Sequence, residues 1–200
     1  MDSMALKLES YCYAFAGMGF ATEAIRKVQL ASAGLSRHKT IPLMYEILSG
    51  KPMPEDLAAM CLARFGEHDE ASRGKMALMP GAEAFLSAAR DAGIPLAIVT
   101  GTPQEVIDRT VDHFALRPFF KRVCGSPPGK AEHLRHMLEA FSLRADRCLF
   151  VGDAVKDQEA AAAVGMPFAG VNNGDDPFRS EGMLLEIRGL GELIPILRAA

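Results

Sequence analysis

The chain has 200 residues, of which 49% are hydrophobic and 24% charged, and its formal net charge is −3. This composition is typical of a globular protein with one domain of ordinary size and a small additional module. The low, mixed charge gives no electrostatic basis for binding a nucleic acid or an anionic membrane surface, so we expect neither as a partner.

Cysteines and apolar segments indicate the compartment. The four cysteines lie far apart and form no Cys-x-x-Cys pair, which favours a reducing environment and argues against structural zinc. The first residues lack the positive charge of a signal peptide, and the most apolar long segment, 160–171, is too short to span a bilayer. We therefore expect a soluble, cytoplasmic protein.

Residues 4–75 carry apolar side chains at helical spacing and contain no convincing strand run. Glycines and prolines interrupt this pattern at 17–19, 34 and 50–54, where helices are expected to end. The pattern predicts a module of about four helices in front of a sheet domain. The predicted boundaries are 4–75 for the helical module, and 1–3 together with 76–200 for an α/β core.

From about residue 80 the pattern alternates between helix and strand. Pro80-Gly81 opens a helix, Ile94–Val99 is an apolar run typical of a buried strand, and Thr102–Glu105 is a capping box that predicts a helix to about Phe114. The further expected elements are strands at 119–124, 147–151 and 167–171, helices at 130–141, 154–164 and 192–198, and a loop over 172–189. This alternation predicts an α/β fold with a Rossmann-like parallel sheet and right-handed crossovers.

Two aspartates follow the strand expected at 147–151. Gly152-Asp153 ends the apolar run and Asp157 comes four residues later, so we expect both carboxylates on one helix face, where like charges repel. Hard oxygen ligands at a strand end suit Mg²⁺, which takes one or two carboxylates and keeps positions for water and phosphate. The alternative is that Asp153 only caps the helix and Asp157 is solvated.

Two more polar residues are expected at the same edge, because the carboxyl ends of parallel strands meet there. Thr100 ends a strand and precedes Gly101 and a helix start, so its hydroxyl and the nearby N–H groups form a candidate anion site. An ordinary turn is the alternative. Lys130 begins a helix, where the macrodipole disfavours a cation. A neighbouring anion or carboxylate would explain this position, and an exposed lysine is the alternative.

The ordered series of Thr100, Lys130 and the Asp153–Asp157 pair resembles the second, third and fourth motifs of the haloacid dehalogenase-like phosphohydrolase superfamily. The resemblance covers nearly the whole chain, as a helical cap followed by a Rossmann-like core. It implies that Thr100 and Gly101 bind the transferring phosphoryl group and that Lys130 balances the charge of phosphate and nucleophile. It also implies that Asp153 holds Mg²⁺, with direct or indirect support from Asp157.

The first motif of that superfamily is a strand followed by Asp-x-Asp-Gly, with Asp-Ser a few residues later. Its first aspartate forms an aspartyl-phosphate and the second is the general acid/base. Here Met1-Asp2-Ser3 matches only the final Asp-Ser, so we expect the nucleophile, the acid/base and their central strand to be missing. Losing about four buried aliphatic side chains at about 1.5–3 kcal/mol each would cost roughly 6–12 kcal/mol. We therefore predict a truncated chain with little or no phosphatase activity.

The helical module contains a basic cluster, Arg37-His38-Lys39, shortly after Gly34. A solvated turn is the simpler interpretation. Because caps in the superfamily set substrate choice, the resemblance also implies a cap loop that closes on a phosphorylated substrate. Arg37 and Lys39 are then candidate specificity residues.

Two functions follow from these residues. The resemblance, which is to phosphoglycolate phosphatases in particular, implies a Mg²⁺-dependent phosphatase of a small phosphorylated metabolite, active through an aspartyl-phosphate in a full-length form. The alternative is a catalytically inactive binding or regulatory protein that keeps a phosphate and Mg²⁺ site. The missing first motif supports this alternative.

Overall fold

The computed structural model describes residues 4–172, 178 and 182–197. The chain divides into two compact units, Met1–Leu78 and Met79–Ala200, and each unit is considered by itself. The expected assignment of residues 1–3 to the α/β core lies outside the described residues.

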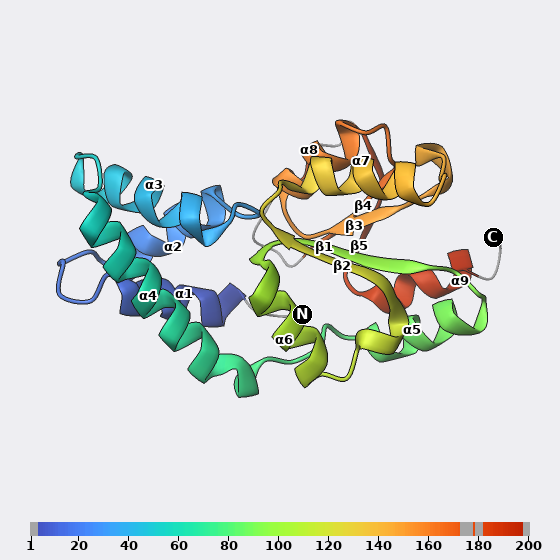
Figure 1. Cartoon of the computed structure of the whole chain (residues 1–200), viewed down its shortest axis with the longest axis horizontal. Helices are drawn as coiled ribbons and strands as arrows, with labels where there is room; N and C mark the ends of the chain where they lie inside the picture. Colours follow the sequence, from blue (N-terminus) through green and yellow to red (C-terminus); the bar gives the residue numbers. More distant parts are fainter. Residues whose placement is uncertain (1–3, 173–177, 179–181, 198–200) are drawn as a thin grey trace. The chain divides into compact units, whose positions relative to one another are not determined.

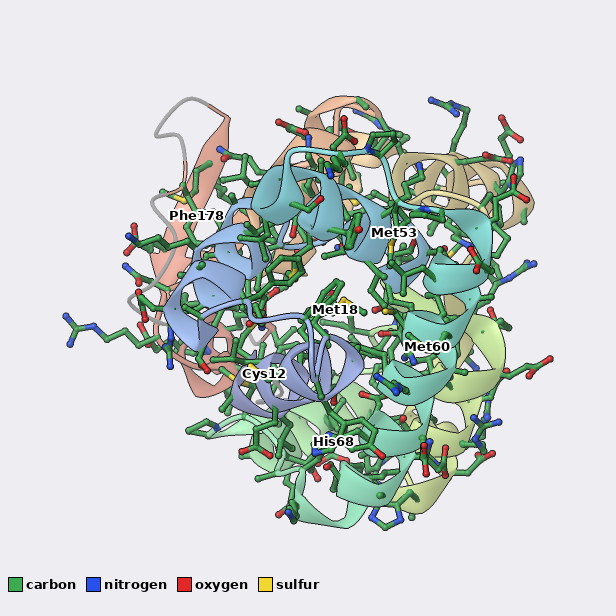
Figure 2. All side chains as sticks on the ribbon, turned by 90° about the vertical axis from the view of Figure 1, so that its left-hand side faces the viewer. Cys12, Met18, Met53, Met60, His68 and Phe178 are labelled. Atoms are coloured by element: carbon green, nitrogen blue, oxygen red, sulfur yellow. The ribbon has the colours of Figure 1, made fainter. Side chains whose placement is uncertain are left out.

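The first unit contains four α-helices among its described residues, the number expected from the glycine breaks. They are α1 (Met4–Ala14), α2 (Thr22–Ala31), α3 (Arg37–Ser49) and α4 (Glu55–Ser72), followed by a short 3₁₀ turn, η1 (Arg73–Lys75). Their core includes Phe15, Ile41 and Met44, which are almost fully buried. Cys12, Met18 and Met53, labelled in Figure 2, pack against this core as partly buried side chains.

The second unit alternates helices and strands, as the sequence pattern predicts. Its α-helices and strands are α5 (Ala82–Asp91), β1 (Leu96–Pro103), α6 (Gln104–His113), β2 (Phe120–Ser126), α7 (Lys130–Ala140), β3 (Phe150–Gly152), α8 (Val155–Ala162), β4 (Phe168–Val171), β5 (Met183–Ile187) and α9 (Ile194–Leu197). Short 3₁₀ turns are η2 (Arg117–Phe119), η3 (Ala145–Arg147) and η4 (Leu190–Leu193).

All strand pairs in the described residues are parallel, which confirms the expected α/β class. The strands form two sheets: β1 pairs with β2, and β3, β4 and β5 follow one another in that order. Val99 lies opposite Cys124 in the first sheet, and Val151 lies opposite Ala169 in the second. Within these residues β1 and β3 have no pairing with each other.

Helices cover the strands on two sides (Figure 1). On one side, an apolar cluster joins α7 and α8 to the strands through residues such as Leu134, Ala161, Val99 and Phe150. On the other side, a second cluster joins α5 and η4 to the strands and includes Phe85, Leu193, Leu149 and Val151. Neighbouring residues Phe150 and Val151 thus belong to opposite clusters, as the alternation of strand side chains requires.

Three local expectations are wrong. The segment 172–189 contains strand β5, where a loop was expected; its side chains alternate between more and less covered positions, but a turn-rich sequence precedes it. Thr102 belongs to β1 and makes no capping contact, because the strand continues to Pro103 before α6 begins. The basic cluster at residues 37–39 is the first turn of α3 rather than a loop.

No helix within the described residues is long and apolar enough to cross a membrane.

Candidate active site

Three polar segments meet at the carboxyl edge of the strands. The register brings Pro103 at the end of β1 opposite Ser126 at the end of β2. Lys130 follows β2, and its side chain reaches Asp157, which follows β3. The carboxyl ends of β1, β2 and β3 therefore lie at one edge, where open parallel sheets bind their ligands.

The Thr100 hydroxyl forms a small turn with Thr102 after the apolar part of β1. The Thr102 N–H donates to Thr100 Oγ1 over 3.2 Å, and the Thr100 hydroxyl donates to Thr102 Oγ1 over 3.3 Å. Both side chains are half-buried. The structure thus adds Thr102 as a second hydroxyl beside Thr100 and Gly101; their role in phosphate binding stays a prediction.

A hydrogen-bonded clamp on Gly125 fixes the end of β2. Gln104 Oε1 accepts the Gly125 N–H over 2.6 Å, and Gln104 Nε2 donates to the Val123 carbonyl over 3.2 Å. His133 Nε2 lies 2.8 Å from the Gly125 carbonyl oxygen, which can only accept, so His133 donates from that nitrogen. A Cβ at Gly125 would lie 2.5 Å from Gln104 Cα at the start of α6. Only glycine therefore fits at this position of β2.

Sequence reasoning missed this clamp. Gln104 was placed only inside a capping box, and His133 was not assigned a structural role. The signal available was a glycine directly at a strand end, which is typical of a close approach between backbone segments. Which side chains would approach it depends on tertiary packing.

Lys130 and Asp157 form a buried ion pair. Lys130 Nζ donates to Asp157 Oδ1 over 2.6 Å, and the side chains are 13% and 6% exposed. Asp157 Oδ2 accepts the Ala154 N–H at the start of α8 over 3.2 Å. The carboxylate expected beside a lysine at a helix start is therefore present, and it is Asp157.

Gly152 makes this arrangement possible. A Cβ added at Gly152 would lie 2.5 Å from Asp157 Cγ and 2.8 Å from its Oδ2. Such distances are far below van der Waals contact, so the carboxylate can pack against the end of β3 only because residue 152 has no side chain. The glycine that ended the apolar run thus has a packing role.

Burial raises the pKa of the Asp157 carboxyl above its usual range, because it removes water from the charged form. The neighbouring Lys130 ammonium opposes this rise, and the negative charge of nearby Asp153 adds to it. Asp157 is therefore held as an anion chiefly by Lys130, and any further cation placed nearby would favour the same charged state.

Asp153 differs from Asp157 in its environment. Asp153 is exposed, and the N-cap of α8 is Ala154 rather than Asp153. The alternative of a capping Asp153 and a solvated Asp157 is thus wrong on both counts. The expected shared helix face is also wrong, because Asp153 precedes the helix.

The carboxylates of Asp153 and Asp157 can be compared as possible ligands of the expected Mg²⁺ ion. Exposed Asp153 fits a Mg²⁺ ion that takes one carboxylate directly and completes its octahedron with water and phosphate. Both carboxylate oxygens of Asp157 already accept protein hydrogen bonds, so Asp157 suits an indirect role better. Among the described residues no group of three His, Cys, Asp or Glu side chains could hold a metal ion.

The structure places Arg37 inside the helical unit's own packing. Arg37 Nη2 donates to Asp69 Oδ2 over 3.0 Å, and its guanidinium lies 4.6 Å from the centroid of the Phe65 ring. The two charged side chains are 11% and 8% exposed. Lys39 is exposed. Both residues belong to the helical unit, and their specificity role stays a prediction.

Comparison with known proteins adds an independent line of evidence. Residues 46–165, more than half of the chain, match the family model of the haloacid dehalogenase-like hydrolases. The chain belongs to this family. The match includes Thr100, Lys130, Asp153 and Asp157, the residues that carried the resemblance.

The chain is similar to individual relatives whose named activities differ. The chain is 27% identical to the phosphoglycolate phosphatase of Pseudomonas putida over 147 residues, 70% of this chain and 54% of that protein. It is 30% identical to the tyrosine-protein kinase PtkA of Mycobacterium tuberculosis over 131 residues, 58% of this chain and 45% of that protein. The chain thus spans about half the length of these curated relatives.

Its fold also matches a solved structure. A protein of Haemophilus somnus described as a predicted phosphoglycolate phosphatase superposes with a TM-score of 0.83 at 20% identity, covering 98% of this chain and 92% of that one. At this identity the likeness concerns the fold, and it agrees with the haloacid dehalogenase-like assignment.

Proposed function

We propose that this hydrolase is a Mg²⁺-dependent phosphatase of a small phosphorylated metabolite, acting through an aspartyl-phosphate in a form that contains a complete sheet. The observation that carries the proposal is the buried Lys130–Asp157 pair beside exposed Asp153 at the carboxyl edge. Phosphoryl transfer demands mainly positioning and charge neutralisation, and this edge offers a fixed cation and an exposed carboxylate. The phosphoglycolate phosphatase relative supports this substrate class.

Each residue has a distinct role in this proposal. The hydroxyl of Thr100 and the N–H groups that follow it hold the oxygens of the transferring phosphoryl group. Lys130, fixed by Asp157, balances the charge shared by the phosphate and the attacking carboxylate. Asp153 holds Mg²⁺, which when bound supplies charge neutralisation on the phosphate oxygens. The helical unit acts as a cap, and Arg37 and Lys39 contribute to substrate choice.

The attacking carboxylate belongs, in this proposal, to a strand between β1 and β3. The pairing supports it: β1 has a strand neighbour only at β2, and β3 only at β4, among the described residues. A strand between them would bring its carboxyl end to the edge that holds Thr100 and Asp153. A form without that strand is then inactive.

A kinetic comparison tests the proposal. The chain as given is expected to hydrolyse no phosphate monoester, whereas a form extended by a first strand ending in Asp-x-Asp-Gly is expected to hydrolyse 2-phosphoglycolate or a similar monoester, and chelation should abolish this activity. In the extended form, Lys130→Ala should lower kcat by about 100-fold or more. Lys156→Ala is the matched control, because Lys156 is an exposed lysine paired with Glu159. Turnover by the 200 residues alone, or an inactive extended form, contradicts the proposal.

The second candidate is a catalytically inactive binding protein that keeps the phosphate and Mg²⁺ site. The two separate sheets of the described residues favour it, because no strand between them provides a nucleophile. Calorimetry with Mg²⁺ and inorganic phosphate would then show binding, while mass spectrometry after incubation with an acyl phosphate would show no phosphorylated aspartate in any form, including the extended one.

A further inference from the structure

The first turn of α7 needs more than the Lys130–Asp157 pair to fix its place. Lys130, the first residue of α7, is tied to α8 only through the end of its long side chain, where Nζ meets Asp157. The N-cap of α7 is Gly129, which has no side chain to bond the free N–H groups of the first turn. The position of this helix start must therefore be set by another contact.

His133 provides that contact. It lies three residues after Lys130, so the two side chains are neighbours on the surface of the helix. His133 Nε2 donates to the Gly125 carbonyl oxygen over 2.8 Å, and the imidazole is half-buried. One turn of α7, which lies over the strands beside α8 (Figure 1), is thus tied to the end of β2 by His133 and to α8 by Lys130.

The carbonyl of Gly125 has a fixed direction, because the residue is also held at its N–H. Gln104 Oε1 accepts this N–H over 2.6 Å. Gln104 Nε2 donates to Asp108 Oδ2 over 2.9 Å and to the Val123 carbonyl over 3.2 Å. Both of these oxygens can only accept, so they determine that the oxygen of the Gln104 amide faces Gly125.

Close packing removes most of the remaining freedom of Gly125. A Cβ added there would lie 2.6 Å from the Gln104 nitrogen and 2.8 Å from the Thr102 carbonyl oxygen. The end of β2 is therefore pressed against the segment that carries Thr100 and Thr102. Through this one residue, His133 fixes α7 relative to the hydroxyls expected to bind phosphate.

A contact that only stabilises the fold is the simpler interpretation of His133. The geometry of the ion pair argues for more. Lys130 Nζ lies 2.6 Å from Asp157 Oδ1, and the two side chains are 13% and 6% exposed, so the ammonium has little room to compensate for a shift of its own helix. A displacement of about 1 Å at a reacting centre can cost about 100-fold in rate.

We propose that His133 is a positioning residue for phosphoryl transfer: by donating to the Gly125 carbonyl it sets the place of α7, and with it the place of the Lys130 ammonium. The inference rests on the proposed function and deepens it, because it names a residue that acts through Lys130 without touching the substrate. The role depends on the Nε2–H donor, which the neutral and the protonated ring both provide.

The ¹H–¹⁵N NMR signal of the Lys130 ammonium group, assigned with Lys130→Arg, tests this in the 200-residue chain without any turnover. Ammonium protons exchange slowly with water in a close ion pair and rapidly when the pair opens. His133→Leu is expected to speed this exchange by roughly tenfold or more. His133→Gln, whose amide nitrogen can take the place of Nε2, is expected to keep it slow. His136→Leu is the matched control, because His136 is an exposed histidine on the same helix.

Unchanged exchange in folded His133→Leu overturns the proposal, whatever the stability of that variant, because a merely stabilising contact does not place the ammonium. Equally fast exchange in His133→Gln or His136→Leu also overturns it. If His133→Leu does not fold, His133→Asn takes its place, since its amide is one bond shorter than that of glutamine and cannot make the contact. The tautomer is checked in the unaltered chain: a neutral His133 ring protonated on Nδ1 instead of Nε2 overturns the proposal.

Kinetics in the form extended by a first strand separate this inference from the proposed function. His133→Leu is expected to lower kcat by about tenfold with little change in KM, and His133→Gln to recover most of the loss. Faster ammonium exchange in His133→Leu together with an inactive extended form would reject the proposed function and keep the placing of Lys130 by His133. An active extended form whose kcat is unchanged in His133→Leu would reject the positioning role and keep the proposed function.

Discussion

Lys130 Nζ and Asp157 Oδ1 lie 2.6 Å apart in a pair whose side chains are 13% and 6% exposed. The pair joins the first residue of α7 to the first turn of α8. A lysine at a helix start is electrostatically disfavoured, and a buried carboxylate is disfavoured by desolvation. Each residue therefore compensates for the unfavourable position of the other, and the ammonium group is held in a fixed place at the strand edge.

Removing the lysine should be strongly destabilising. Lys130→Met leaves the Asp157 carboxylate buried without its cation, and breaking one partner of a buried pair costs about 3–5 kcal/mol at pH 7. Because burial raises the pKa of Asp157, the variant can neutralise the carboxyl by protonation, so the loss should be smaller at pH 5. Urea unfolding at the two pH values measures this. Lys156→Met, at an exposed pair, should change the free energy of unfolding by less than about 1 kcal/mol.

Gly152→Ala should disturb the same pair sterically. The added Cβ would lie 2.5 Å from Asp157 Cγ, and Asp157 cannot move without loosening its bonds to Lys130 and Ala154. Overpacking of this kind costs about 1–3 kcal/mol. Gly129→Ala is the control, because a Cβ there meets no atom within 4 Å and the φ angle of −76° suits any residue. Equal thermal stability of the two variants would contradict the steric role of Gly152.

Much of this site follows from local sequence, and the reasons are physical. Strand runs and helix starts depend on near neighbours, so the positions of Lys130 at a helix start and Asp153 after a strand end could be predicted. Thr100 was expected to end its strand, but it lies inside β1, which continues to Pro103. The buried state of Asp157 could not, because a four-residue spacing is equally compatible with a solvated helix face. The macrodipole argument did predict that Lys130 needs an anionic partner, but it could not say which carboxylate provides it.

The parts that sequence reasoning missed depend on long-range contacts. Strand β5 shows the alternation of an edge strand, but only its pairing with β4 distinguishes Met183–Ile187 from a loop. Gln104 and His133 contact Gly125 from two different helices, and no local sequence pattern predicts these contacts. Arg37 was interpreted from its charge alone, whereas Asp69 and Phe65, far along the chain, determine its environment.

Alanine substitutions at Arg37 and Lys39 should distinguish a structural role in the helical unit from a role in substrate binding. Arg37→Ala removes the partner of buried Asp69 and the contact with Phe65, so it should destabilise the helical unit by about 3 kcal/mol. Lys39→Ala should change stability by less than about 0.5 kcal/mol. Unfolding followed through tyrosine fluorescence measures both, because the three tyrosines, Tyr11, Tyr13 and Tyr45, all lie in the helical unit.

The proposed specificity role has its own readout. In a catalytically competent form, Lys39→Ala should raise KM for the phosphorylated substrate with little change in stability. Arg37→Lys, which keeps the charge but not the planar contact with Phe65, should recover only part of the stability lost in Arg37→Ala. A KM unchanged in Lys39→Ala would reject its contact with substrate.

Asp108 in α6 should give the free energy of unfolding a pH dependence opposite in sign to that from Asp157, because the pKa of Asp108 is lowered and that of Asp157 is raised. Hydrogen bonds from Gln104 and then Arg117 hold the pKa of Asp108 below its ordinary value. A carboxyl with a lowered pKa in the folded state contributes stability above its unfolded pKa of about 3.9 and loses it as the pH falls further. Asp108→Asn should therefore be less stable than the parent at pH 7, and the difference should shrink below about pH 4. Gln104→Ala removes the largest contribution, so the NMR titration midpoint of Asp108 should move upward; a midpoint unchanged in that variant would show that Gln104 does not hold the carboxylate.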